Sequence, residues 1–113
     1  MEIPIIQKTY EVYKEVVDIN NHLDKRWRYS LGHSVEESVL ALLESLIMAK
    51  HAPKTLKSSY LIKSMSHLEI SRLKLRLILE LKAIKNQTNI FKIQLHNEEI
   101  GKMLGGWIRS LEK

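Results

Sequence analysis

KTLKSSYLIKSMSHLEISRLKLRLILELKAIKN, residues 54–86, is the longest stretch of the chain with an unbroken helical period. It contains neither glycine nor proline, and leucine or isoleucine returns at nearly every third or fourth position, as on an α-helix. At about 1.5 Å per residue this helix would be about 48 Å long. A helix of this length needs other helices to cover its apolar side chains, so we predict an all-α protein.

The apolar side chains of residues 54–86 fall on two stripes of the helical wheel. One stripe comprises Leu61, Met65, Leu68, Leu75 and Leu79, and the other comprises Ile62, Ile70, Leu73, Leu77, Leu81 and Ile84. A helix on the outside of a bundle normally needs one stripe, so two stripes indicate neighbours on two sides. The second neighbour is either a helix of the same chain or another subunit. Because a chain of this length has little interior to spare, we expect an oligomer.

Charged residues fill the rest of this wheel. Between the stripes lie Glu69, Arg72, Arg76 and Glu80, at spacings that allow an ion-pair ladder on one helix. We expect this ladder and the stripes to hold subunits together. Elsewhere the sequence predicts a basic ridge, made of Lys63, Lys74 and Lys85 at intervals of 11 residues, with Lys82 further round.

Three further segments have a helical period and surround this one. They are residues 4–23, 34–52 and 89–111. Pro4 suits a first helical position, Ser34 and Glu37 have capping-box spacing, and Pro53 disfavours helix at the residue before it. Residues 24–33 break the period and are predicted to be a loop. We therefore predict one domain over residues 1–113, an up-and-down four-helix bundle.

Composition limits the possible functions. The 113 residues include no cysteine, which excludes disulfides, thiol catalysis and cysteine-based metal sites. The net charge is +5, and residues 50–85 hold nine basic and two acidic side chains. This asymmetry indicates a polyanionic partner, although a solvated helix face would have the same composition. Because there is no signal-peptide pattern and no run of about 18 apolar residues, we expect a soluble cytoplasmic protein without membrane contacts.

The sequence has no pattern typical of an enzyme. Its five histidines are scattered, and none stands four residues from another. His96 and Glu99 have a metal-ligand spacing, but a di-iron bundle needs two Glu-x-x-His units in the opposite order. The glycines match no phosphate-binding loop. We therefore expect no catalytic residues, no metal and no cofactor.

Glycines cluster near the C-terminal end of the sequence, where Gly101, Gly105 and Gly106 precede Trp107. Each glycine inside a helix costs roughly 0.5–1 kcal/mol relative to alanine. We interpret the cluster as a place where the backbone approaches another helix closely, with Trp107 sealing the contact. The alternative is a helix that frays near its end.

Two motifs carry a resemblance to a known bacterial family. They are RYSLG, residues 28–32, and EIGKMLGGWIRS, residues 99–110. With the helix that follows the first motif, they resemble the four-helix-bundle family of accessory variability determinant proteins of diversity-generating retroelements. That family also includes proteins encoded by intervening sequences in ribosomal RNA genes. The resemblance covers nearly the whole chain.

The resemblance implies a bundle that assembles as a homopentameric barrel with a positively charged surface. It also implies binding to nucleic acid and association with a reverse transcriptase that copies template RNA into mutagenised cDNA, without enzymatic activity of its own. The family supplies no catalytic residues. The positions that match its motifs are expected to be structural or to serve assembly; they are Arg28, Tyr29, Gly32, Gly105, Gly106 and Trp107.

The residue patterns and the resemblance together lead to a hypothesis of backbone binding to RNA or DNA. The candidate contacts are Lys63, Lys74, Lys82, Lys85, Arg26 and Arg28. No aromatic residue is interleaved with the lysine ridge, whereas Trp27 sits between two arginines and is either a stacking residue or buried under its loop. The alternative hypothesis is a ring-forming scaffold, of the ribosomal RNA intervening-sequence type, that binds only protein.

Overall fold

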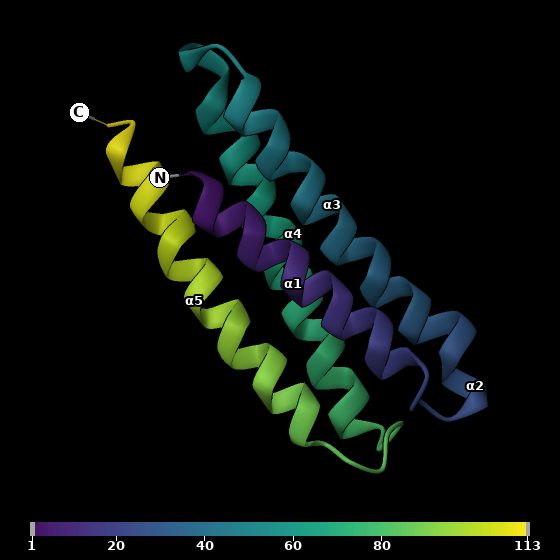
Figure 1. Ribbon diagram of the computed structural model, residues 1–113. Coiled ribbons are helices and arrows are strands. Elements are labelled where there is room, and N and C mark those ends of the chain that lie inside the picture. The colour runs from purple at the N-terminus through teal and green to yellow at the C-terminus, as the bar shows by residue number, and fades with distance from the viewer. Residues whose placement is uncertain (1, 113) are drawn as a thin grey trace.

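The computed structural model describes residues 2–112, which form one bundle of four long helices (Figure 1). Consecutive long helices run in opposite directions and pack side by side, and the first also packs against the last. The bundle measures 46 × 21 × 20 Å, so the helices share one long axis. The helices are α1 (Glu2–Asn20), α3 (His33–His51), α4 (Lys54–Glu80) and α5 (Thr88–Ser110), with α2 (Lys25–Trp27) and the π-helical turn η1 (Arg28–Gly32) preceding α3. This is the four-helix bundle that the helical periods predicted.

The prediction of a loop at residues 24–33 is wrong. Helical residues run from α2 through η1 into α3, and Gly32 itself has helical dihedral angles. Trp27 and Leu31, four residues apart and therefore on one face of the helical segment, both pack against the core. Ser34 therefore starts no helix, and no side chain caps α3. The expected capping box is also wrong.

The seam between α3 and α4 is lined by small polar side chains. Ser45 Oγ lies 2.7 Å from Ser64 Oγ, and both serines are buried. At the end of α3, Lys57 Nζ donates to the carbonyls of Ala49, at 2.8 Å, and Lys50, at 3.0 Å. This ammonium satisfies carbonyl groups that a helix C-terminus leaves free. As the sequence predicts, α3 ends just before Pro53, where Ala52 is extended.

The two apolar stripes of α4 have different surroundings. Leu61, Leu68 and Leu75 of the first stripe are buried in the core, although Met65 is 41% exposed. The second stripe leaves five side chains between 40% and 61% exposed: Ile62, Ile70, Leu73, Leu77 and Leu81. We call these five residues the outer stripe. The described helices of this chain thus cover only one of the two stripes. None of these helices is long and apolar enough to cross a membrane.

The close backbone approach occurs at Gly32 and not at the C-terminal glycines. A Cβ at Gly32 would lie 2.9 Å from Asn20 Cγ and closer still to Asn20 Oδ1. Asn20 is buried at the end of α1, and its Nδ2 donates to the carboxylate of Glu36. A Cβ at Gly101 would instead lie 3.6 Å from Leu68 Cδ2, an ordinary contact, and Gly105 and Gly106 face only the side chain of Arg109. Within residues 2–112 no helix approaches the glycine cluster that closely, and a close contact there with another subunit stays a prediction.

The Gly32→Ala variant is expected to lower the free energy of unfolding by about 1–3 kcal/mol, because the new methyl group displaces the buried Asn20 side chain from Glu36. Its matched control, Gly101→Ala, is expected to raise that free energy by about 0.5–1 kcal/mol through helix propensity. Urea denaturation followed by circular dichroism measures both. Equal unfolding midpoints for the two variants would contradict the assignment of Gly32 as the tight contact.

Candidate nucleic-acid interface

Two connecting segments meet at one end of the bundle. Residues 21–24 follow α1, and residues 81–87 join α4 to α5. The Asp24 N–H donates to the carbonyl of Ala83 at 3.0 Å, and Leu23 forms an isolated antiparallel bridge with Ile84. The side chains of Leu23, Ala83 and Ile84 are at most 3% exposed. Their burial fixes the two segments to each other and to the core.

The end of α4 has a lysine in an unusual backbone conformation. Lys82 has a φ of 54°, the one positive value among the non-glycine residues described. The N–H of Ala83 donates to the carbonyl of Ile78, and that of Lys82 donates to the carbonyl of Leu79. These two bonds form a Schellman motif, in which glycine normally takes the left-handed position. The prediction that this helix continues to residue 86 is therefore wrong, because the chain turns back at Lys82.

The segment before η1 adds arginines to the same end. The Arg26 guanidinium lies 4.7 Å from the centroid of the Trp27 ring, and Trp27 also packs against the core. Arg28 Nη2 reaches back to the carbonyls of Asn21, at 3.3 Å, and Leu23, at 3.4 Å. Arg28 thus braces the segment, whereas Lys25 and Arg26 are exposed.

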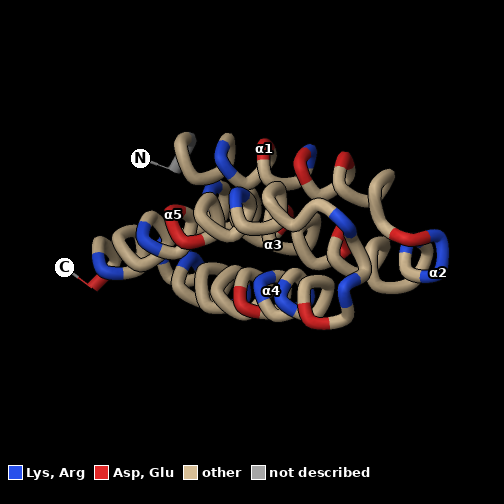
Figure 2. The backbone as a smooth tube through the Cα atoms, turned by 90° about the horizontal axis from the view of Figure 1, so that it is seen from below, with Lys and Arg blue, Asp and Glu red and all other residues tan. Residues whose placement is uncertain are grey.

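These contacts gather cations from two parts of the sequence. We call the group Lys25, Arg26, Arg28, Lys82 and Lys85 the basic end. Residues 21–28 and 81–87 contain one carboxylate, that of Asp24, whose backbone N–H donates to the carbonyl of Ala83. Figure 2 shows the blue segments of α2 and of the turn after α4 at the same end of the bundle. The sequence predicted Arg26, Arg28, Lys82 and Lys85 as contacts but not Lys25, although Lys25 directly precedes Arg26.

The predicted lysine ridge does not form a continuous surface. Lys74 Nζ donates to Ser38 Oγ at 2.7 Å and to the carbonyl of Ser34 at 3.1 Å, so it is tied to α3. Lys63 is exposed beside the ring of Tyr60, in the first half of α4. Because α4 ends at Glu80, Lys85 is not on this helix and does not continue the line of lysines spaced 11 residues apart. The structure therefore separates Lys63 and Lys74 from the basic end.

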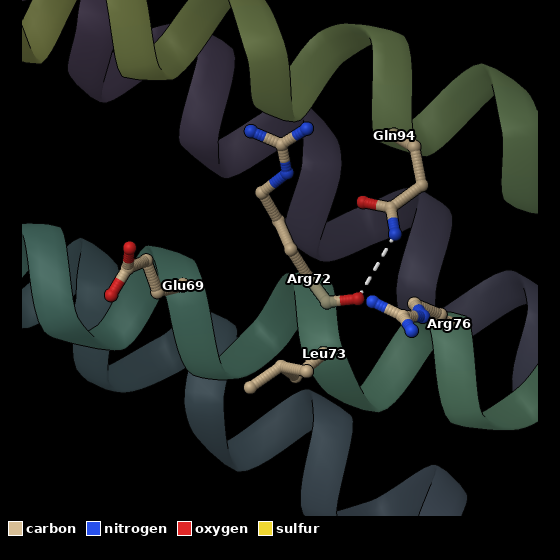
Figure 3. Close-up of a pocket in the computed structure, with 5 residues that line it drawn as sticks. All are labelled: Glu69, Arg72, Leu73, Arg76 and Gln94. Atoms are coloured by element: carbon tan, nitrogen blue, oxygen red, sulfur yellow. Dashed lines mark hydrogen bonds between the residues drawn. The ribbon is translucent and has the colours of Figure 1, made fainter.

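The predicted arginine–glutamate ladder opens onto a shallow groove between α4 and α5 (Figure 3). Gln94 Nε2 donates to the Arg72 carbonyl at 3.0 Å and joins the two helices. Arg76 Nε lies 3.3 Å from Glu80 Oε2, and this is the ladder's one ion pair within residues 2–112. Arg72 and Arg76 are both exposed and contribute nothing to the core of the single chain. Trp107, in contrast, is only 9% exposed and packs within the core.

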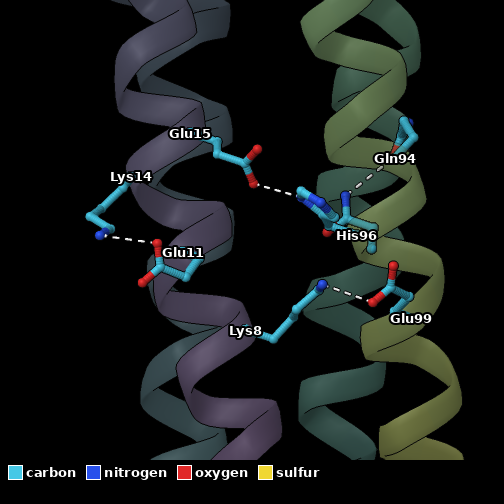
Figure 4. Close-up of polar contacts among 8 residues, drawn as sticks. Lys8, Glu11, Lys14, Glu15, Gln94, His96 and Glu99 are labelled. Carbon is cyan, nitrogen blue, oxygen red and sulfur yellow. Dashed lines mark hydrogen bonds and ion pairs between the residues drawn. The ribbon is translucent and has the colours of Figure 1, made fainter.

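Polar contacts connect α1 to α5 along another side of the bundle (Figure 4). Lys8 Nζ lies 2.8 Å from Glu99 Oε2, and His96 Nδ1 lies 2.8 Å from Glu15 Oε1. The Lys8 ammonium, through its hydrogen bond, holds the pKa of Glu99 below its ordinary value. His96 and Glu99 thus bind different partners on α1. Among residues 2–112, no three histidine or carboxylate side chains are placed to hold a metal ion.

These features define a helical bundle with a basic end and an exposed apolar stripe on α4. The model of the bAvd-like family matches residues 3–111. The chain therefore belongs to the bAvd-like family, that of the accessory variability determinant of diversity-generating retroelements. Membership implies an accessory role with a retroelement, in a family that is not known to be catalytic. No curated protein matches the chain.

Lys82 offers a direct test of the turn that builds the basic end. The Lys82→Gly variant is expected to raise the free energy of unfolding by about 1 kcal/mol, because glycine enters the left-handed region without steric cost. Lys82→Gln removes the charge but keeps a residue with a Cβ in the left-handed conformation. It is the matched control and should leave the free energy of unfolding nearly unchanged. Thermal and urea unfolding measure both variants. A destabilised Lys82→Gly protein would contradict the left-handed assignment.

Proposed function

We propose that this protein binds RNA or DNA through the basic end, as the non-enzymatic accessory partner of a retroelement reverse transcriptase that copies template RNA into mutagenised cDNA. The observation that carries the proposal is the meeting of residues 21–28 with residues 81–87, which gathers cations far apart in the sequence. Clustered lysine and arginine on one surface is the usual electrostatic footprint of nucleic-acid binding. Membership of the bAvd-like family implies a role with a retroelement and suggests the reverse transcriptase as the partner.

The conformation of Lys82 supports a functional use of this end. A non-glycine residue in the left-handed region costs roughly 1–2 kcal/mol, and glycine would avoid that cost. Backbone strain of this kind tends to accumulate at functional sites. A lysine at this position adds a positive charge to the basic end.

The exposed cations are suited to phosphate groups and carry no base selectivity by themselves. Lys25, Arg26, Lys82 and Lys85 are exposed, whereas Arg28 is engaged by backbone carbonyls. Four phosphate contacts on duplex DNA would give a slope of about −3.6 in log affinity against log salt concentration. Lys63 and Lys74 stand outside the proposed site because of their positions on α4.

Replacing the four exposed cations of the basic end by glutamine is expected to weaken binding about tenfold or more at roughly 0.1 M salt, since the phosphate contacts are lost. The matched control replaces Lys50, Lys54, Lys63 and Lys102, which are exposed elsewhere and give the same change in net charge. Fluorescence anisotropy with labelled RNA and DNA measures the affinities. Equal losses in both variants would mean that binding follows net charge, and unchanged affinity in both would refute the proposed function.

A second candidate function, a ring-forming scaffold that binds protein, is favoured by the outer stripe. We propose that another copy of this chain covers it. Helices α1 and α3, which pack against each other, also carry exposed apolar side chains: Tyr10, Val17, Leu40 and Ile47. We call these four residues the α1–α3 patch. Two different apolar surfaces favour head-to-tail contacts, which close into rings when the rotation permits, and a homopentamer is one such ring.

Leu73→Glu in the outer stripe and Leu40→Glu in the α1–α3 patch should each prevent ring assembly, because a charge enters an apolar contact. Mixing the two variants should give a 1:1 dimer, since each retains the surface that the other lacks. Light scattering after size exclusion measures the masses, and Glu44→Gln on α3 serves as the control. A self-pairing outer stripe would instead leave Leu40→Glu fully assembled and make mixing ineffective.

A further inference from the structure

Tyr29 has an exposure that the packing of the bundle does not explain. Its side chain is 77% exposed, more than any other large apolar side chain that the structure describes. Tyrosine usually buries its ring and leaves only the hydroxyl group in water. Nothing in the core requires an aromatic ring at this position, so its use must lie outside the single chain.

The local backbone directs Tyr29 away from the core and toward the cations. Trp27 and Leu31, two residues before and after it, both pack against the core. In a helical segment a residue two positions from each of them lies on the opposite, outer face. Lys25 and Arg26 precede Tyr29 by four and three residues, which makes them its neighbours on the helical surface. Tyr29 thus borders the basic end.

The other aromatic residue of this segment is already in use. Trp27 is half-buried against the core, and the Arg26 guanidinium covers its ring at 4.7 Å. The sequence suggested Trp27 as the stacking residue between two arginines. The structure leaves Tyr29 as the aromatic ring with free faces beside Lys25 and Arg26. The π-helical turn η1, which contains Tyr29, is of a kind that often marks functional sites.

We propose that Tyr29 stacks on an unpaired base of a single-stranded nucleic acid whose phosphates are bound by the basic end. The inference rests on the proposed function and adds that the bound nucleic acid is single-stranded. An aromatic ring beside a row of cations is the common arrangement for single strands, where each stacked base contributes about 5- to 100-fold in affinity. In a duplex the bases are stacked on each other and their faces are unavailable, so Tyr29 gives a preference for single strands.

The test compares Tyr29→Ala and Tyr29→Phe with the wild type on a labelled single strand of about 20 nucleotides and on the duplex of the same sequence. That length exceeds the roughly 4–16 nucleotides that one single-strand-binding domain covers. Tyr29→Ala is expected to lose about 5- to 100-fold in affinity for the single strand and little for the duplex. Tyr29→Phe keeps the ring and should retain the affinity. Leu95→Ala, at a side chain that is 61% exposed on α5, controls for the loss of exposed apolar surface.

The outcomes separate this inference from the proposed function. If wild type binds and the glutamine variant of the basic end does not, but Tyr29→Ala binds both ligands like wild type, the stacking role is refuted and the basic end stands. An equal loss on both ligands also refutes it. If light scattering shows a changed mass for Tyr29→Ala at unchanged affinity, Tyr29 belongs to an interface between copies. If wild type binds neither ligand, both proposals fail.

Discussion

The contact between residues 21–24 and residues 81–87 is the constraint on which the basic end depends. It is small, consisting of the Asp24 to Ala83 hydrogen bond and the bridge between Leu23 and Ile84. Bringing like charges together at a surface costs up to about 1 kcal/mol per close pair in water, and salt reduces that cost. Burying a leucine or isoleucine side chain contributes about 1.5–3 kcal/mol. The apolar anchors therefore outweigh the repulsion and hold the cations in place.

The seams of the bundle differ in chemistry, which gives the helices different roles. The seam of α3 and α4 contains the buried Ser45–Ser64 hydrogen bond, and Lys57 and Lys74 bind carbonyl groups of α3 across it. The seam of α1 and α5 carries partly exposed polar contacts, the Lys8–Glu99 ion pair and the His96–Glu15 hydrogen bond, and contacts of this kind add little to stability. Val12 and Val16 of α1 are fully buried, so α1 is held chiefly by apolar contacts. The α3–α4 hairpin is the rigid support of both the outer stripe and the turn at Lys82.

The helical period in the sequence was enough to predict four helices, because one buried face repeats along each of them. It could not predict where α4 ends, since no glycine marks the left-handed position and the reversal depends on burying Ala83 and Ile84 against Leu23. The helix before α3 was missed because a π-helical turn shifts the period that the pattern assumes. Lys74 looked like a surface cation, and only the packing of α4 on α3 directs it to Ser38. Most residues of the basic end were predicted as contacts. Their gathering at one end of the bundle could not be predicted, because it depends on contacts between segments far apart in the sequence.

The outer stripe and the basic end are placed so that assembly and ligand binding can reinforce each other. The outer stripe runs along the side of α4, whereas the basic end caps the bundle where α4 stops. In a closed ring of head-to-tail contacts, the rotation axis would bring the basic end of each copy to the same rim. The apolar sides would then be buried while the cations stayed in water. A polyanion crossing that rim would meet several basic ends at once, and each further contact would be made at high effective concentration. A modest group of cations in one chain would thereby become a strong site in the assembly.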